Sequence, residues 1–139
     1  MTKINVYLNF PGNTEEAFNY YKSIFGGDLQ IFRFKDLPME GVTLSDEDAS
    51  KIMHISLPIG DDVLMGTDAL ESMGQRLDLG NNVNVSVSPD GKPEADRIFS
   101  ALASGGKVEM PIADQVWGDY FGACTDKYGI HWMMNYHEE

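Results

Sequence analysis

Apolar and polar residues alternate in short runs along the chain, which predicts strands with one buried face. In the first run, residues 4–10 (INVYLNF), the even positions are apolar and the odd positions hold Asn, Tyr and Asn. The period then becomes helical: Asn13 is a candidate N-cap with Glu16 three residues later, and Gly26 is a candidate end of the helix. Residues 28–34 (DLQIFRF) are expected to form the next strand.

The same order of patterns returns later in the chain. Residues 83–88 (VNVSVS) alternate as the first run does, a helical segment follows, and residues 107–112 (KVEMPI) form the next expected strand. An offset of 79 superposes Ile4 on Val83 and Gly27 on Gly106. The hairpins that close the two halves match at an offset of 69, which places Met65 on Met134. Each half is therefore expected to run strand, helix, then three strands.

These patterns predict an α+β fold made of two βαβββ modules in tandem. We expect a curved, mixed, mainly antiparallel eight-stranded sheet, with the helices on its convex face and a cavity on its concave face. The chain is expected to be a single domain over residues 1–139, with a first module at 1–70, a linker at 71–80 and a second module at 81–139. The acidic segment 36–51 is expected to be either a flap over the cavity or a solvated loop.

Side chains out of phase with the apolar positions of the strands should face the concave cavity, because side chains alternate across a strand. They would form a polar, uncharged floor that can bind a small ligand bearing an oxygen or an amide. These floor positions are Asn5, Tyr7, Asn84 and Ser86. Met65 and Met134 would add an adaptable apolar wall. The alternative is that side chains from the two halves fill the concavity.

His54 is the candidate for chemistry, as a general base or a hydrogen-bond donor facing the cavity with Ile52 and Ser56. A structural histidine is the alternative. Trp117 is a candidate rim residue with the area to hold an aromatic or cationic ligand, and core packing is the alternative. A buried, inert thiol is expected of the single cysteine, Cys124.

Composition and charge narrow the function. Ten basic against 22 acidic residues give a net charge of −12, which disfavours nucleic acid as a partner. Apolar runs are too short to cross a membrane, no signal sequence precedes the first strand, and a lone cysteine is typical of a reducing compartment. We therefore expect a cytoplasmic protein that binds neither nucleic acid nor membranes.

Several stretches resemble the PhnB-like branch of the vicinal oxygen chelate superfamily, which includes glyoxalase I, extradiol dioxygenases and bleomycin resistance proteins. They are YLNFPGNTEEAFNYYKSIFGG, MHISLPIGDDVLMGTD, WGDYFG and TDKYGIHWMMN. The resemblance implies the fold described above and a homodimer. Branch members are often labelled glyoxalase-like or 3-demethylubiquinone methyltransferase, but no glycine-rich loop of the methyl-donor kind follows a strand in a parallel βαβ unit here.

The resemblance also implies where a metal would bind. Relatives that use a metal take His, Gln or Glu ligands from the first and last strands of each half. The corresponding positions here hold Asn5, Val6, Tyr7, Asn84, Val85, Ser86, Leu64, Met65, Met133 and Met134. Thioethers and neutral amides are poor ligands for hard divalent ions. No cofactor is therefore predicted.

The run HWMMNYH poses a separate question, because imidazole and thioether ligands suit copper. His131 and Met133 alternate and share a face, but His137 lies about 20 Å farther along an extended strand. This spacing favours a cavity wall or core over a metal site.

Three hypotheses remain at this stage. The first is a metal-independent protein that binds a small organic molecule in the concave pocket. The second is a metal-dependent lyase, isomerase or dioxygenase of glyoxalase type, with His54 and an acid such as Asp68 or Glu109 as ligands. The third is a non-enzymatic protein that sequesters a drug, for which acidity and aromatic residues are the arguments.

Overall fold

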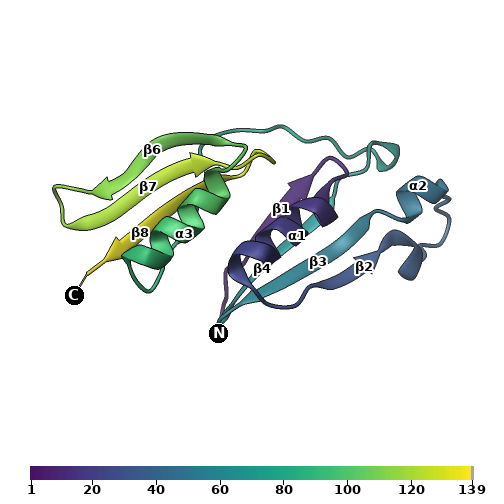
Figure 1. Ribbon diagram of the computed structural model, residues 1–139. Coiled ribbons are helices and arrows are strands. Elements are labelled where there is room, and N and C mark those ends of the chain that lie inside the picture. Colours follow the sequence, from purple (N-terminus) through teal and green to yellow (C-terminus); the bar gives the residue numbers. More distant parts are fainter. Residues whose placement is uncertain (139) are drawn as a thin grey trace. The chain divides into compact units, whose positions relative to one another are not determined.

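A computed structural model describes residues 1–138 and divides the chain into two compact units, Met1–Asp78 and the part from Leu79 onward. Each unit contains one helix of three turns and four strands (Figure 1). Tandem βαβββ modules and the α+β class are thus confirmed. Residue 139, the predicted end of the second module, lies outside the described residues.

The first unit holds a four-stranded sheet in the order β1-β4-β3-β2. Its strands and three-turn helix are β1 (Val6–Phe10), α1 (Thr14–Phe25), β2 (Gln30–Arg33), β3 (Ile52–Ile59) and β4 (Asp62–Asp68). Its short helical turns are η1 (Phe34–Asp36), α2 (Asp46–Ala49) and η2 (Glu71–Met73). The outer strand β1 pairs parallel with β4, and the other pairs are antiparallel.

The second unit repeats this plan in the order β5-β8-β7-β6. Its elements are β5 (Val85–Val87), α3 (Lys92–Ala103), β6 (Lys107–Asp114), β7 (Asp119–Thr125) and β8 (His131–His137). Again the first strand pairs parallel with the last, and the remaining pairs are antiparallel. In each unit the helix lies over one face of its own sheet (Figure 1).

The sequence of α1 explains where the helix begins and ends. Its buried stripe recurs every three to four residues and consists of Thr14, Ala17, Phe18, Tyr21 and Ile24. At the C-terminal end Gly26 takes φ +79° and donates its N–H to the Lys22 carbonyl. Asn13 stands at the N-cap position but makes no side-chain capping hydrogen bond, so the expected cap is not formed there.

Each helix packs an aromatic ring onto a glycine in its sheet. A Cβ atom on Gly66 would lie 2.6 Å from Cε1 of Phe18, and one on Gly122 would lie 3.0 Å from Cε1 of Phe99. Phe18 is fully buried. Glycine at these strand positions therefore allows the helix to approach the sheet closely.

The internal repeat is preserved in the strands and slips by one residue in the helices. Gly27 and Gly106, at the predicted offset of 79, both lie against a backbone carbonyl near the end of the third strand, that of Pro58 and that of Thr125. The buried faces of the helices, however, align Ala17 with Ala95, at an offset of 78. The offset of 79 predicted for the repeat is therefore wrong by one residue in the helices.

No helix within residues 1–138 has the length and apolar character needed to cross a membrane.

Candidate functional site

The face of the first sheet opposite α1 carries three residues of the predicted site, Tyr7, His54 and Met65. In its central row, Tyr7 of β1 lies beside Met65 of β4, which lies beside Ser56 of β3. Ile55 and Leu57, which alternate with Ser56, are fully buried on the helix side. Tyr7 and Met65 therefore point to the face of the sheet that the sequence predicted for them.

Tyr7 and His54 meet on this face. The Tyr7 hydroxyl lies 3.2 Å from Nδ1 of His54, and the ring centroids are 5.7 Å apart. In a neutral imidazole, either the tyrosine donates to Nδ1 or a protonated Nδ1 donates to the phenol oxygen. The pair can therefore offer a ligand either a donor or an acceptor, depending on the tautomer.

Thr67, two residues after Met65 on β4, is anchored by the backbone. Its hydroxyl donates to the Met53 carbonyl at 2.8 Å. Tyr7 keeps 44% of its surface exposed, whereas the His54 side chain is half-buried. The histidine is thus positioned by its neighbours while the tyrosine stays accessible.

The other polar positions lie at the beginnings of the outer strands. Asn5 precedes β1, Asn84 precedes β5, and both are exposed. Ser86 is exposed on β5 and lies opposite Met133 of β8. A common floor formed by these residues with Tyr7 would span both units and stays a prediction.

Met134 does not occupy the position predicted for it. Tyr7 pairs with Met65, but its repeat partner Ser86 pairs with Met133, so Met133 is the counterpart of Met65. Met134 is 1% exposed and lies on the same buried face of β8 as Trp132, whereas Met133 between them points to the opposite face. The turn from Ile59 to Asp62 is shorter than the turn from Thr125 to His131, and this difference shifts the register by one residue.

Ile52 also departs from its predicted face. Phe32 pairs with His54 while the next residue, Arg33, pairs with Ile52, so β3 carries an extra residue, Met53, in a bulge. Ile52 consequently enters the core at 1% exposure, and it does not share the face of His54.

Trp117 lies in the turn between β6 and β7 and is 58% exposed, with its ring against Phe121 at 6.1 Å. Its neighbour Tyr120 has a structural role: its hydroxyl donates to Asp96 of α3 at 2.5 Å. That hydrogen bond raises the pKa of Tyr120. Trp117 as a rim residue stays a prediction.

The acids considered as metal ligands are engaged elsewhere. Asp68 is 1% exposed; its Oδ1 accepts from the Thr14 N–H and hydroxyl, and its Oδ2 accepts from the Ile52 N–H. It thereby caps α1 in place of Asn13 and ties β4 to β3. Glu109 accepts from the Thr125 hydroxyl at 3.1 Å.

The histidines of the second unit are likewise held by the protein. His131 places Nδ1 2.8 Å from the Thr125 hydroxyl and donates from Nε2 to the Gly80 carbonyl at 2.9 Å. His137 pairs with Asp119 at 2.6 Å, and this contact lowers the pKa of the Asp119 carboxyl. Within residues 1–138, no three His, Cys, Asp or Glu side chains gather as a metal site would need.

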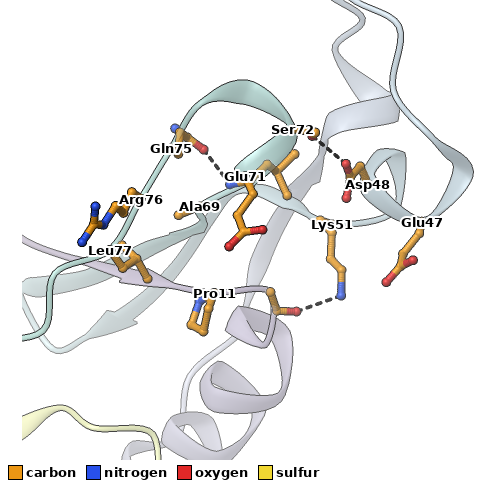
Figure 2. Close-up of a pocket in the computed structure, with 12 residues that line it drawn as sticks. Pro11, Glu47, Asp48, Lys51, Ala69, Glu71, Ser72, Gln75, Arg76 and Leu77 are labelled. Atoms are coloured by element: carbon orange, nitrogen blue, oxygen red, sulfur yellow. Dashed lines mark hydrogen bonds between the residues drawn. The ribbon is translucent and has the colours of Figure 1, made fainter.

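Sequence reasoning missed the hollows of the first unit, which do not lie on the predicted sheet face. One of about 680 Å³ lies beside the end of β1 and is bordered by α2 and η2 (Figure 2). The acidic segment 36–51 contributes Glu47 and Asp48 to its wall. The signal in the sequence was Lys51, the lone cation that ends this acidic segment.

The comparisons with known proteins agree on the family. The profile of a family described as 3-demethylubiquinone-9 3-methyltransferase matches residues 2–135. Protein PA1353 from Pseudomonas aeruginosa is 36% identical, with 100% of both chains covered and a TM-score of 0.87. A putative 3-demethylubiquinone-9 3-methyltransferase, PhnB protein, from Bacillus cereus is 25% identical over 97% of this chain and 99% of that one, with a TM-score of 0.74.

A more distant structure shares the fold alone. A glyoxalase/bleomycin resistance protein/dioxygenase family enzyme from Burkholderia phytofirmans PsJN is 16% identical over 95% of this chain and 97% of that one, with a TM-score of 0.64. The family profile over residues 2–135 shows that the chain belongs to the PhnB-like family that carries the 3-demethylubiquinone-9 3-methyltransferase description.

Proposed function

We propose that this PhnB-like protein binds a small organic molecule at the exposed face of its first sheet, without the divalent metal of its metal-using relatives. The observation that carries the proposal is the contact between the Tyr7 hydroxyl and Nδ1 of His54 at 3.2 Å. It joins two adjustable hydrogen-bonding groups on a face that α1 does not cover.

The chemistry around this pair suits a neutral, oxygen-bearing ligand. With Tyr7 donating to Nδ1, Nε2 of His54 carries a proton for a carbonyl or hydroxyl oxygen. Met65, in the same row as Tyr7, supplies a flexible apolar surface beside these polar groups. A few polar groups against an apolar wall are typical of small-molecule sites.

The residues at the superfamily's metal positions do not fit a hard divalent ion. These positions hold the phenol of Tyr7 beside the thioether of Met65 in one unit, and Ser86 beside Met133 in the other. Zn²⁺, Mn²⁺ and Mg²⁺ require imidazole, thiolate or carboxylate ligands. We therefore assign no step to a metal.

The topology also supports binding over methyl transfer. Helix α1 connects β1 to β2, which lie at opposite edges of the first sheet. A nucleotide-binding βαβ unit instead joins parallel strands through a glycine-rich turn.

Elemental analysis tests the metal-free part of the proposal. The protein is purified without chelator, soaked separately in Zn²⁺, Ni²⁺, Mn²⁺, Fe²⁺ and Cu²⁺, and desalted. We expect no ion to remain in stoichiometric amount. About one tightly held ion per chain would contradict the proposal and lead back to a metal-dependent enzyme around His54.

A fragment screen by protein-detected NMR tests the site itself. Fragments that perturb Tyr7 and His54 should lose roughly tenfold in affinity on Y7F or H54Q, because each substitution removes one hydrogen bond to the ligand or to its partner. H137Q is the matched control, since His137 is an exposed histidine paired with Asp119 in the other unit. Fragments that bind equally to all three variants would place the site elsewhere.

We also propose that two copies associate. The edge strand β6 supports this proposal, because Val108 and Met110 on it are 46% and 41% exposed. Sedimentation velocity should show a dimer, and M110K should shift it towards monomer because a charge on an edge opposes strand pairing. If the chain stays monomeric at about 100 µM, any association is weaker than even a transient interface, and this proposal is refuted.

A further inference from the structure

The hollow beside the end of β1 has its own construction, independent of the Tyr7–His54 pair. A smaller hollow of about 330 Å³ adjoins it and shares Gly12, Glu47 and Lys51 with the larger one. Lys51 thus stands between the two. Both volumes lie near or within the range of ligand pockets.

Hydrogen bonds fix the walls of the larger hollow. Ser72 of η2 donates to the Asp48 carboxylate of α2 at 2.7 Å, which joins the two short helical turns. The Leu70 N–H donates to the Gln75 side chain at 2.8 Å and holds the segment after β4 in a closed turn (Figure 2). The hollow therefore has a built frame, even though its residues come from three separate segments.

Lys51 is positioned by the backbone and not by an acid. Its ammonium donates to the Gly12 carbonyl at 3.0 Å, and within residues 1–138 no carboxylate oxygen lies within 4.0 Å of it. Gly12 takes φ +123°, a backbone conformation that residues with a side chain rarely adopt, where its carbonyl meets the ammonium. Two of the three ammonium protons remain for another acceptor. In a chain of net charge −12, a partly buried lysine without an acid partner is a candidate for binding an anionic group of a ligand.

Two carboxylates border the same space. Glu71 and Lys51 both extend towards the turn at Pro11, and Glu47 lies on the other side of Lys51 (Figure 2). No hydrogen bond or ion pair engages either glutamate side chain in the described part of the chain. Of the charged side chains on its wall, Arg76 pairs with Asp78 and Asp48 accepts from Ser72, whereas Lys51, Glu47 and Glu71 have no ion-pair partner in the described residues.

From this arrangement we infer that the hollow binds a small zwitterion that carries a carboxylate and a protonated amine, as amino acids do. The ligand carboxylate accepts from Lys51, and its ammonium pairs with the Glu71 carboxylate on the Pro11 side of Lys51. A simple anion would meet two repelling carboxylates, and a simple cation would meet the lysine. Only a ligand with both charges complements the lysine and a neighbouring carboxylate together.

The probes are glycine, 4-aminobutyrate and 6-aminohexanoate, with butyrate and butylamine as singly charged controls at equal ionic strength. Each is titrated into the full ¹⁵N-labelled chain. At least one zwitterion should shift the backbone signals of Gly12, Lys51 and Glu71 saturably, with a Kd of roughly millimolar, as expected of a ligand this small.

Matched variants assign the two charges. K51M should weaken binding at least about tenfold, whereas K35M, the same change on the exposed Lys35 of η1, should leave it unaltered. E71Q should weaken binding similarly, and E40Q in the acidic segment should not. Glu71 is exposed, so E71Q keeps the test valid should K51M fail to fold.

Three results would overturn the inference: no shift with any zwitterion, binding of butyrate or butylamine as tight as that of the zwitterions, or zwitterion binding untouched by both K51M and E71Q. The Tyr7 and His54 variants should not change this binding. Loss of zwitterion binding at Lys51 can therefore be told apart from loss of fragment binding at Tyr7 and His54.

Discussion

At the scale of single residues, the structure separates side chains that hold the fold from side chains that can meet a ligand. Asp68 is buried and accepts three hydrogen bonds from the first unit's own backbone and Thr14. Among the described residues, the His54 ring hydrogen-bonds to the side chain of Tyr7. An acid and a histidine that the sequence offered as ligands for one metal thus have different roles.

Replacing Asp68 by Asn tests the structural role. The amide would place an N–H where Oδ2 now accepts from the Ile52 N–H, leaving buried donors unpaired. We expect D68N to lower the free energy of unfolding by about 2–3 kcal/mol in urea denaturation. D61N, in the exposed turn between β3 and β4, is the control and should change it by less than about 0.5 kcal/mol. Equal effects of the two would contradict the capping role.

Cys124 provides a second test at this scale. It is 1% exposed, and burial raises the pKa of its thiol to about 11. At pH 8 about one thiol in a thousand is then ionised, so a thiol-specific disulfide reagent should react slowly with the native chain and rapidly in urea. Fast reaction of the native protein would contradict the expectation of an inert thiol.

At the scale of the elements, the helix–sheet contacts depend on two glycines. A methyl group at position 66 meets the fully buried ring of Phe18, and one at 122 meets both Phe99 and the backbone of Ile112. G66A and G122A should each cost about 1–3 kcal/mol of stability by overpacking. G80A, where the nearest atom lies 3.7 Å away, should cost less than about 0.5 kcal/mol. Circular dichroism during urea unfolding measures all three, and a neutral G66A would show that α1 can shift.

The elements also show how far sequence reasoning reached. The alternation of β1 and the helix that follows it depend on local periodicity, and both were predicted, as was the order of elements along the chain. Ile4, which was expected on the buried face of the strand, instead lies before β1 and is 97% exposed. The face of Met134 depended on the length of a turn in another part of the repeat, and the face of Ile52 depended on a bulge opposite Arg33. Such shifts arise from pairing between strands, which a single strand's pattern does not encode. The hollow at Lys51 needs three segments brought together and could not be read from any one of them.

At the scale of the whole molecule, acid stability should reflect ion pairs in both units. The hydrogen bond and charge of Arg33 lower the pKa of Glu15, and His137 does the same for Asp119. A carboxyl whose pKa is lower in the folded state binds more protons when the chain is unfolded. Its contribution to the free energy of unfolding is therefore fully present above the pKa of the unfolded state, 4.5 for Glu15, and disappears as the pH falls through the pKa of the folded state.

The melting temperature of E15Q therefore tests this linkage. At pH 7 E15Q should melt at a lower temperature than the wild type. The difference should shrink as the pH falls below about 4.5, because the Glu15 carboxylate of the wild type then becomes protonated and loses its ion pair with Arg33. E16Q, an exposed change on the same helical turn, should show a difference that varies less with pH. A constant gap for E15Q across this range would contradict the ion-pair origin of its effect.

The parallel pairing of the first and last strands in each unit governs the order of events during synthesis. Val6 pairs with Leu64, 58 positions later (64 − 6), so the first strand leaves the ribosome long before its partner exists. At translation rates of about 5–20 residues per second this wait lasts seconds, while a hairpin such as β3–β4 forms in microseconds. The nascent first unit should therefore assemble around α1 and the β2–β3–β4 meander and receive β1 last. A chaperone would meet the unprotected strand of residues 6–10 before any other part of this sheet.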